Sequence, residues 1–352
     1  MLTDPLDMLL PRDIPSESFV ADWVSIIHGG DLTPPNRVGN AVFTNLAMSE
    51  EMRKVLSRIP QAGRAVLDSD GVVEDLAHDA YFHIRRVEND AATHFGRTAI
   101  HGRLIFLREV AEAPFTIPPS YLNEIDRSFA DLLSCLAGGV VNSAPATTLW
   151  ESEGTSCQPK PRWVRGHQIF AALTQGLIFS FQCMGRALRA GKNDGVQKWA
   201  DLSISLLRGS AAAFAFTGDF PVEEYANTVR PSMMPPESEV GLSGLMSIDH
   251  RFLAQTMRDM RPALKSLSEH DPARHQGIAS ALTAVYDSHI HVCERFVGAR
   301  PSILTEGRTK KSGPSLIEQF KTLRLKPFEQ ASRAARLIES SPKVAGVCPF
   351  HE

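Results

Sequence analysis

Long apolar runs are missing from this chain of 352 residues. No uncharged stretch reaches the roughly 18 residues that a membrane-spanning helix needs. The first residues, MLTDPLDMLLPRD, include acidic residues and an early proline, whereas a signal peptide has a basic stretch followed by an apolar run. We therefore expect a cytoplasmic protein that does not enter a membrane.

Paired cysteines are also lacking. The five cysteines are scattered, form no CxxC pair and are odd in number. This pattern argues against a disulfide framework and against a structural zinc site. We expect most of them to be buried thiols, with Cys293 as the exception because of its neighbours. In chain order they are Cys135, Cys157, Cys183, Cys293 and Cys348.

An excess of positive charge is absent as well. The formal net charge is −3, which gives no electrostatic reason to expect nucleic acid as a partner. The 43% of hydrophobic and 22% of charged residues are ordinary for a folded globular protein. We find no internal repeat and no flexible linker, and we predict one domain over residues 1–352.

Alternating strand patterns are nearly absent, whereas apolar residues recur at helical spacing. The predicted fold class is therefore all-α, a helical bundle. Ser49, followed by two glutamates, reads as a helix start. Further helices are expected over about 71–95, 101–113, 119–137, 164–191, 193–216, 243–268, 272–297 and 314–340. Loops rich in Pro, Gly and Ser are expected over about 138–163, 229–241 and 298–314.

The most informative segment runs from Asp271 to Gly298. Asp271 and Pro272 form a strong helix start, because Asp caps the first turn and Pro fits its first position. Gly298 is a suitable C-terminal stop. Spacings of three and four place one set of residues on a single face of this helix, namely Leu282, Val285, His289, Cys293 and Phe296.

His291 lies about 200° round the helix from His289, on a polar stripe with Asp287 and Arg295. Helical geometry therefore favours His289 over His291 as the histidine with a chemical role. From spacing alone, His289 and Cys293 could be a hydrogen-bonded core histidine beside a small thiol, or two ligands of a metal. They could also serve a haem, because a helical histidine commonly supplies an iron ligand.

A second histidine lies on another expected helix. His250 shares an apolar face with Met246, Leu253, Ala254 and Met257. A single histidine on such a face is usually a core residue, although the same face would suit the wall of a haem pocket.

The run from His289 to Gly298, HIHVCERFVG, resembles the proximal-histidine region of the tryptophan 2,3-dioxygenase superfamily. Arg295 and Gly298 fit its pattern, whereas Cys293 replaces an apolar residue. His250, 38 intervening residues and His289-x-x-x-Cys293 are similar to the histidine-ligated haem-dependent aromatic oxygenases that hydroxylate tyrosine derivatives.

This resemblance implies a tryptophan-dioxygenase-like helical bundle that encloses a haem. It implies His250 and His289 as the two iron ligands and a single thioether from the haem to Cys293. A haem with two protein ligands has no open position, so His250 is expected to leave before the oxidant binds, and a displaced His250 could also act as a base.

Further upstream, His78-Asp79-Ala80-Tyr81 resembles the distal segment of tryptophan dioxygenases. This implies that His78 faces the ligand side of the haem, where a neutral imidazole could serve as the catalytic base. The alternatives in the same region are His83, His94 and His101. The segment after Gly298 departs from the substrate loop of the dioxygenases, so no substrate contact is carried over.

The implied activity is haem-dependent hydroxylation of a 3-methyl-L-tyrosine-like phenol to a catechol in natural-product biosynthesis, as in the formation of saframycin antibiotics. The partners would be a small aromatic amino acid and either dioxygen with a reductant or hydrogen peroxide. The alternatives are an indole ring-cleaving dioxygenase and a non-catalytic bis-His electron carrier or sensor. A homodimer is expected by analogy only.

Overall fold

The computed structural model describes residues 5–15, 43–59, 65, 73–88, 90–141, 148–238, 240–242, 246–298 and 312–339. These residues are mostly helical, which confirms the all-α prediction. In chain order the helices are η1 (Pro11–Asp13), α2 (Asn45–Arg58), α3 (Val73–Tyr81), α4 (Ala91–Glu112), α5 (Pro119–Leu136), α6 (Pro159–Arg189), α7 (Asn193–Thr217), α8 (Val222–Glu224), the π-helix η4 (Tyr225–Val229), α9 (Arg230–Ser232), α10 (Ile248–Asp259), α11 (Arg261–His270), α12 (Pro272–Phe296) and α13 (Gly313–Glu339).

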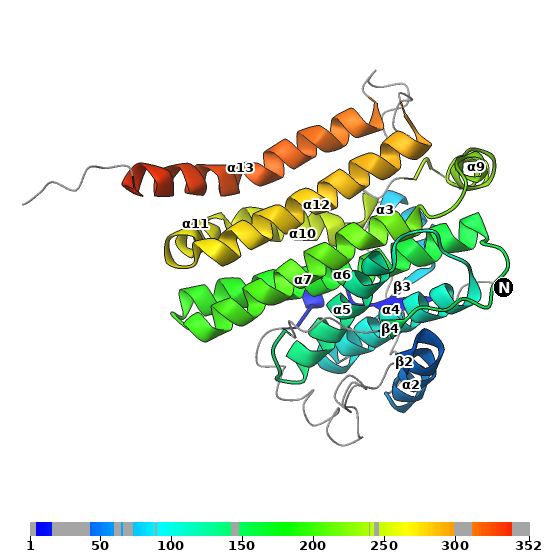
Figure 1. Ribbon diagram of the computed structural model, residues 1–352, viewed down its shortest axis with the longest axis horizontal. Helices are drawn as coiled ribbons and strands as arrows, with labels where there is room; N and C mark the ends of the chain where they lie inside the picture. Colours follow the sequence, from blue (N-terminus) through cyan, green and yellow to red (C-terminus); the bar gives the residue numbers. More distant parts are fainter. Residues whose placement is uncertain are drawn as a thin grey trace, which may run out of the picture.

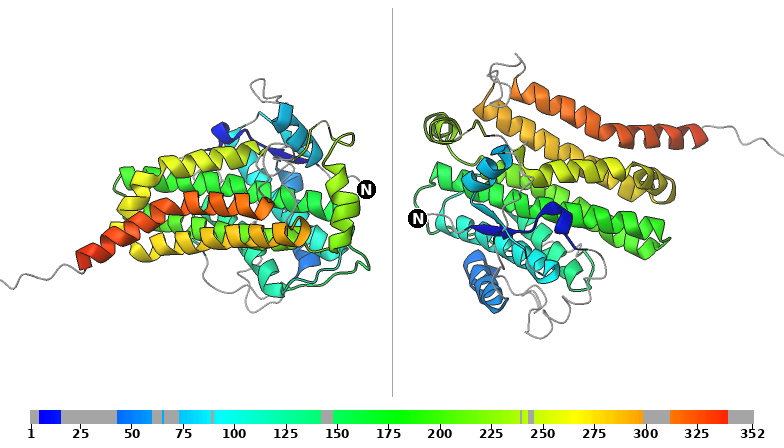
Figure 2. Two further views of the ribbon diagram at one scale, coloured as in Figure 1. Left: turned by 90° about the horizontal axis from the view of Figure 1, so that it is seen from above. Right: turned by 180° about the vertical axis from the view of Figure 1, so that it is seen from behind.

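The long helices are stacked in successive layers (Figure 1). α2 packs on α4, and α4 and α5 pack on the central pair α6 and α7. On the other side, α7 contacts α12, α6 contacts α10, and α13 covers α11 and α12 (Figures 1 and 2). The central pair is buried by its neighbours, and its fully buried side chains include Phe179, Phe181, Trp199 and Phe216.

The strands are very short and pair residues that are far apart in the sequence. β1 (Leu6–Met8) pairs in parallel with β3 (Ile84–Arg86), and β2 (Phe43–Thr44) pairs in parallel with β4 (Thr148–Leu149). All three residues of β1 are buried. β3 alternates, with Ile84 and Arg86 buried and Arg85 exposed. This alternation sends the side chain of Arg86 into the protein.

The expected helix over 71–95 is wrong. α3 ends at Tyr81, β3 follows, and α4 begins at Ala91 and continues without a break to Glu112. His83 has a φ of 51°, which a right-handed helix does not allow. Asp90 begins a new helix, because its carboxylate accepts a hydrogen bond from the N–H of Thr93 at 2.9 Å.

Two further expectations about helices need correction. The expected helix over 243–268 is divided into α10 and α11, because Pro262 cannot donate the N–H that a continuous helix needs. Ser49 does not begin a helix. It lies inside α2 and donates to the carbonyl of Leu46, whereas Thr44 caps the helix.

The expected loops are only partly correct. The loop predicted over 138–163 ends earlier, because α6 begins at Pro159, and the loop predicted over 229–241 contains the end of η4 and α9. Most of the loop predicted over 298–314 lies outside the described residues.

The helix that carries His289 is confirmed at both ends. Asp271 caps α12 by accepting from the N–H of Arg274 at 3.1 Å, and Pro272 occupies the first turn. Gly298 has a φ of 57°, a conformation that suits glycine, and its N–H donates to the carbonyl of Cys293. Among the described helices, none has the length and apolar character needed to cross a membrane. The single domain over 1–352 remains a prediction.

Candidate functional site

The face of α12 lies as expected from the sequence. Leu282 and Phe296 are buried, Val285, His289 and Cys293 between them are half-buried, and His291 is exposed. The ring of His289 stacks on Phe214 of α7, with the ring centres 4.5 Å apart and the planes 13° apart. This stacking, together with the packing of α12 on α7, fixes the orientation of the imidazole.

His289 and Cys293 are both uncharged near neutral pH. Burial and, to a smaller extent, a charge on His250 lower the pKa of His289 to about 4. Burial raises the pKa of the Cys293 thiol to about 12, and the charge of Glu294 acts in the same direction. The face therefore offers a neutral imidazole and, one turn later, a protonated thiol.

His250 lies in the first turn of α10. Burial, the charges of Arg324 and Arg251 and a charge on His78 together lower its pKa to about 4. A charge on His250 in turn lowers the pKa of His289, so the two imidazoles lie near each other although they come from different helices. The structure brings together the two histidines that the sequence pattern singled out.

Arg324 of α13 connects the two helices that carry these histidines. Its Nη1 donates to the carbonyl of Ala254, one turn beyond His250, at 3.0 Å. The same guanidinium hydrogen-bonds the phenol of Tyr286, one turn before His289. α13 therefore fixes α10 against α12 beside both imidazoles.

His78 is also in this region, and its orientation is set by Asp79. Nδ1 of His78 lies 3.3 Å from Oδ1 of Asp79. Burial alone would raise the pKa of Asp79, but the charge of Arg86 and the hydrogen bonds from Arg86 and His78 lower it below its usual value. Because an ionised Asp79 can only accept, Nδ1 of His78 donates, and in the neutral ring Nε2 carries the lone pair.

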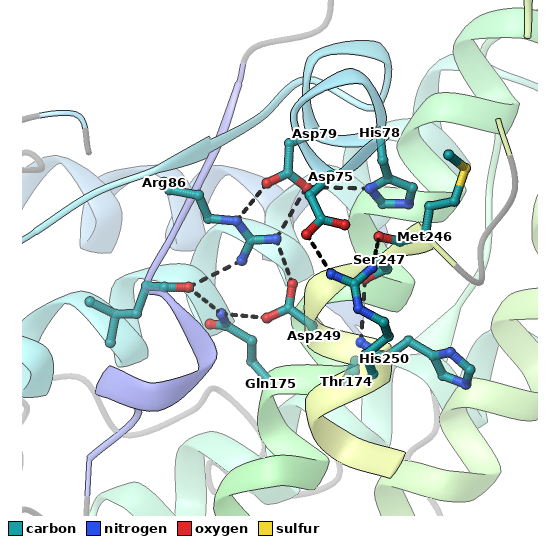
Figure 3. Close-up of polar contacts among 12 residues, drawn as sticks. Asp75, His78, Asp79, Arg86, Thr174, Gln175, Met246, Ser247, Asp249 and His250 are labelled. Atoms are coloured by element: carbon teal, nitrogen blue, oxygen red, sulfur yellow. Dashed lines mark hydrogen bonds and ion pairs between the residues drawn. The ribbon is translucent and has the colours of Figure 1, made fainter. Parts of the chain in front are cut away.

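A buried arginine joins the His78 helix to the His250 helix (Figure 3). Arg86 donates to both oxygens of Asp79 at 2.7 and 3.1 Å and to Oδ2 of Asp249 at 2.6 Å. It also donates to the carbonyl of Leu9 at 3.1 Å. Asp79 directly follows His78, and Asp249 directly precedes His250. This network therefore positions the two histidines relative to each other.

Gln175 of α6 completes the network. Its Nε2 donates to Oδ1 of Asp249 at 3.0 Å and to the carbonyl of Leu9 at 2.8 Å. Figure 3 shows that the ring of His250 points away from these contacts. The backbone N–H of His250 donates to Oγ of Ser247, the N-cap of α10. The network thus holds the helix through Asp249 and does not use the imidazole of His250.

The sequence reasoning missed His167 of α6. Its Nδ1 donates to the carbonyl of Trp163 at 2.7 Å, so in the neutral ring Nε2 carries the lone pair. The ring stacks on Phe82 with 4.1 Å between centres, and Phe82 contacts His78 on the other side. Burial, together with charges on His78 and His289, lowers the pKa of His167 to about 3, although its hydrogen bond to Trp163 opposes this.

Aromatic and apolar side chains surround the end of α12. Phe296 stacks on Tyr225 and on Phe220, and the ring of Trp163 stands edge-on to all three. Met246, Val292 and Leu242 belong to the same buried cluster. The surroundings of Cys293 are therefore apolar and rich in aromatic rings.

The alternatives to His78 occupy other positions. His94 is buried near Asp7 of β1 and Arg97. The carbonyl of His83 accepts from Leu6 and from Gln168, and His101 is half-buried on α4. A charge on His78 lowers the pKa of His250, so His78 lies near this proposed iron ligand.

The three uncharged histidines predict a pH dependence for the protein without a bound cofactor. An unfolded histidine has a pKa of about 6.5, whereas the folded pKa is about 4 for His250 and His289 and about 3 for His167. As the pH falls from 6.5 towards 4, the unfolded chain therefore binds protons that the folded protein excludes. We expect the free energy of unfolding to decrease in this window by roughly 1–3 kcal/mol per histidine.

Urea denaturation at several pH values between 7 and 4.5 measures this effect. His167→Gln should make the loss of stability smaller, whereas His291→Gln, at an exposed position, should leave it unchanged. A free energy of unfolding that is constant between pH 7 and 4.5 would mean that these rings bind protons in the folded protein as readily as in the unfolded chain.

Comparison with known proteins identifies related sequences. The family model of the SfmD 3-methyl-L-tyrosine peroxygenase matches residues 7–276. This stretch includes His78, His167 and His250 and ends before His289 and Cys293. A 3-methyl-L-tyrosine peroxygenase from Streptomyces lavendulae is 36% identical over 165 residues, which cover 47% of this chain and 45% of that protein. The alignment thus spans less than half the length of the relative.

A crystal structure of reduced SfmD, obtained by soaking with sodium hydrosulfite, has a similar fold. The TM-score is 0.68 at 23% sequence identity, and the match covers 83% of this chain and 98% of that one. The helical arrangement is therefore shared over nearly all of the solved structure. These comparisons do not test the expected relationship to the tryptophan 2,3-dioxygenase superfamily, which stays a prediction.

Proposed function

The chain belongs to the family of the SfmD 3-methyl-L-tyrosine peroxygenase, and from this premise we propose that it hydroxylates a tyrosine-type phenol to a catechol on a bound haem. The phenol and hydrogen peroxide would give the catechol and water. The family name favours hydrogen peroxide over dioxygen with a reductant. The observation that carries the proposal is the pair of neutral imidazoles, His250 and His289, held close together by two different helices.

The residues present fit a haem. A porphyrin supplies four nitrogens to iron, so the protein needs to contribute only one or two ligands, and neutral imidazoles are suitable. His250 and His289 are kept neutral by burial. The protonated thiol of Cys293 is a poor iron ligand, but its S–H can add across a vinyl group to give a thioether, with no atom lost.

When bound, the haem would supply the iron at which the oxidant is activated. His289 is suited to the permanent ligand, because it lies well inside α12 and its ring is stacked on Phe214. His250 is suited to the exchangeable ligand, because it lies in the first turn of a short helix. Its release would open a coordination position, and substrate binding could shift the population towards that state.

His78 is our candidate for the catalytic base. Its Nδ1–H is held by Asp79, which Arg86 fixes in turn, so the lone pair on Nε2 has a defined direction. A neutral imidazole can accept the phenol proton near neutral pH. A displaced His250 is the second candidate. The aromatic side chains around Phe296 would help to exclude water from the reacting ring.

One assay tests the proposed function. The haem-loaded protein is given 3-methyl-L-tyrosine with ¹⁸O-labelled hydrogen peroxide, and the product is analysed by mass spectrometry. We expect a catechol that contains one labelled oxygen atom. His78→Gln should keep the haem spectrum and lose about 10²–10⁴-fold in turnover, the usual effect of removing a general base.

The two alternative functions, an indole ring-cleaving dioxygenase and a non-catalytic electron carrier or sensor, predict different results. N-formylkynurenine from tryptophan, with no catechol from any tyrosine, would indicate a ring-cleaving dioxygenase. A ferrous protein that keeps both histidines bound under carbon monoxide, and forms no product, would indicate an electron carrier or sensor.

The thioether makes a separate prediction. If Cys293 is linked to the haem, denaturing mass spectrometry should show the polypeptide with the mass of haem added, and Cys293→Ala should release the haem. Cys157→Ala, which removes the second half-buried cysteine of the described residues, is the matched control and should keep the linkage. Free haem from the unaltered protein would mean that Cys293 is only a packed thiol.

A further inference from the structure

An acidic side chain beside His78 has an unused hydrogen-bonding position. Asp75 of α3 is 7% exposed. Its Oδ2 accepts from Nη2 of Arg251, whereas its Oδ1 is buried and has no hydrogen-bond partner among the described residues. A buried carboxylate oxygen without a donor is costly, by about 1–3 kcal/mol or more for a charged group. This position therefore calls for a donor that the described part of the protein does not provide.

The other acidic groups nearby are engaged. Both oxygens of Asp79 and Oδ2 of Asp249 accept from Arg86, and Oδ1 of Asp249 accepts from Gln175. Asp75 does not contact Arg86 in this network. Among the described carboxylates named here, Asp75 is the one with an oxygen that has no donor, and it pairs with a cation that is itself partly exposed.

Asp75 and Arg251 lie next to the proposed reaction centre. Asp75 precedes His78 by one helical turn, so both are on one face of α3. Arg251 follows His250 directly, and its Nη1 donates to the carbonyl of Met246 at 2.8 Å. Figure 3 shows Asp75 beside His78 and above the segment that carries Met246 and Ser247. The side chain of Arg251 is 46% exposed, so its charge reaches the surface of the site.

We propose that Asp75 and Arg251 form the subsite that recognises the α-amino and α-carboxylate groups of an aromatic amino acid. The ammonium of the ligand donates to Oδ1 of Asp75, and the carboxylate lies against the guanidinium of Arg251. Charge-assisted hydrogen bonds of both kinds are strong and directional. This inference rests on the proposed function, because it takes the substrate to be a tyrosine derivative.

The subsite would also set specificity. A ligand without the ammonium group would leave a buried carboxylate oxygen unpaired, and sites of this kind reject such analogues strongly. Simple phenols should therefore bind weakly, although they carry the ring that reacts. The subsite would place the side chain of the amino acid beside His78 by holding its backbone end.

Calorimetric titration of the haem-loaded protein with three ligands tests this. The first ligand is 3-methyl-L-tyrosine. The second, 3-(4-hydroxy-3-methylphenyl)propionic acid, lacks the amino group of this amino acid. The third, 4-(2-aminoethyl)-2-methylphenol, lacks its carboxylate. Asp75→Asn should raise the dissociation constants of the two ligands that have an ammonium by about 10- to 100-fold. It should change the dissociation constant of the propionic acid by less than about threefold. Arg251→Gln should weaken the binding of the two ligands that have a carboxylate and leave the binding of the amine unchanged.

A matched control removes another Arg–Asp pair. Asp201 of α7 pairs with Arg274 at 2.8 and 3.0 Å, and Asp201→Asn should bind all three ligands as the unaltered protein does. Because the two variants in the subsite affect opposite ligands, either one tests the proposal if the other does not fold. Equal weakening of all three ligands by both variants, or no weakening, would overturn the proposal, as would an unaltered protein that binds none of them.

The titration, compared with the assay for catechol formation, distinguishes failure of the subsite proposal from failure of the proposed function. If the unaltered protein binds the three ligands with this pattern but forms no catechol, the subsite proposal stands and the hydroxylase proposal fails. If the unaltered protein hydroxylates the propionic acid analogue at the same rate as the amino acid, the hydroxylase proposal stands and the subsite proposal fails.

Discussion

Alanine at position 289 should give a folded protein that no longer holds haem stably, and its hydroxylation activity should fall to background. His289 is half-buried, and its ring is held flat on Phe214. It is the proposed ligand with the most fixed orientation. Removing it takes away the iron ligand of α12, which is also the group that would hold a haem in place while the linkage to Cys293 forms. The loss of packing should cost only about 1–2 kcal/mol, which a folded domain can usually tolerate.

Two neighbouring variants make this prediction specific. His250→Ala should keep the haem, because His289 remains, but it should convert a low-spin ferric spectrum to a high-spin one that binds cyanide readily. His291→Ala changes an exposed histidine on the same helix and should leave the spectrum as it was. The ratio of haem to protein after gel filtration and the absorption spectrum measure all three. A native low-spin spectrum in His289→Ala would show that another residue binds the iron.

The second large effect is expected on stability. Arg86→Met should lower the free energy of unfolding by about 3–5 kcal/mol, because it leaves the buried carboxylates of Asp79 and Asp249 without their shared cation. A loss of this size is a large part of the 5–15 kcal/mol that holds a typical domain folded. His78 and His250 should lose their fixed positions at the same time, so haem binding should become heterogeneous.

The adjacent residue provides the control. Arg85 lies on the same strand, points the other way and pairs with Asp7, with its side chain 51% exposed. Because Arg85 is half exposed and its loss leaves one buried carboxylate, that of Asp7, without a cation rather than two, Arg85→Met should have a smaller effect, about 1–3 kcal/mol. Urea unfolding of both variants measures the difference. Equal losses in the two would mean that the burial of Arg86 has no energetic consequence.

The sequence was sufficient where a structural signal was local. Asp271 with Pro272 and the closing Gly298 correctly predicted α12, and the spacing along it correctly separated half-buried His289 from exposed His291. His250 could be linked to His289 because the resemblance supplied the 38-residue interval. Helical periodicity alone did not relate the two helices to each other.

The sequence was insufficient where distant residues decide the local structure. The end of α3 depends on β3, which pairs with β1 nearly 80 residues away. The network around Arg86 joins residues separated by up to 166 positions, which no short pattern reveals. His167 was overlooked because it lies among Trp163 and Phe170 on a largely apolar helix. Its spacing of four from Trp163 was the available signal.

The long separations around Leu9 also affect how the protein is made. Arg86 follows Leu9 by 77 residues, and Asp249 follows Arg86 by another 163. At about 5–20 residues per second, the ribosome delivers Asp249 roughly 10–30 s after Arg86. Until then Arg86 lacks one of its carboxylate partners, and the helix that carries His250 does not exist. The site is therefore assembled late in translation, and insertion of the proposed haem would follow synthesis of the C-terminal helices.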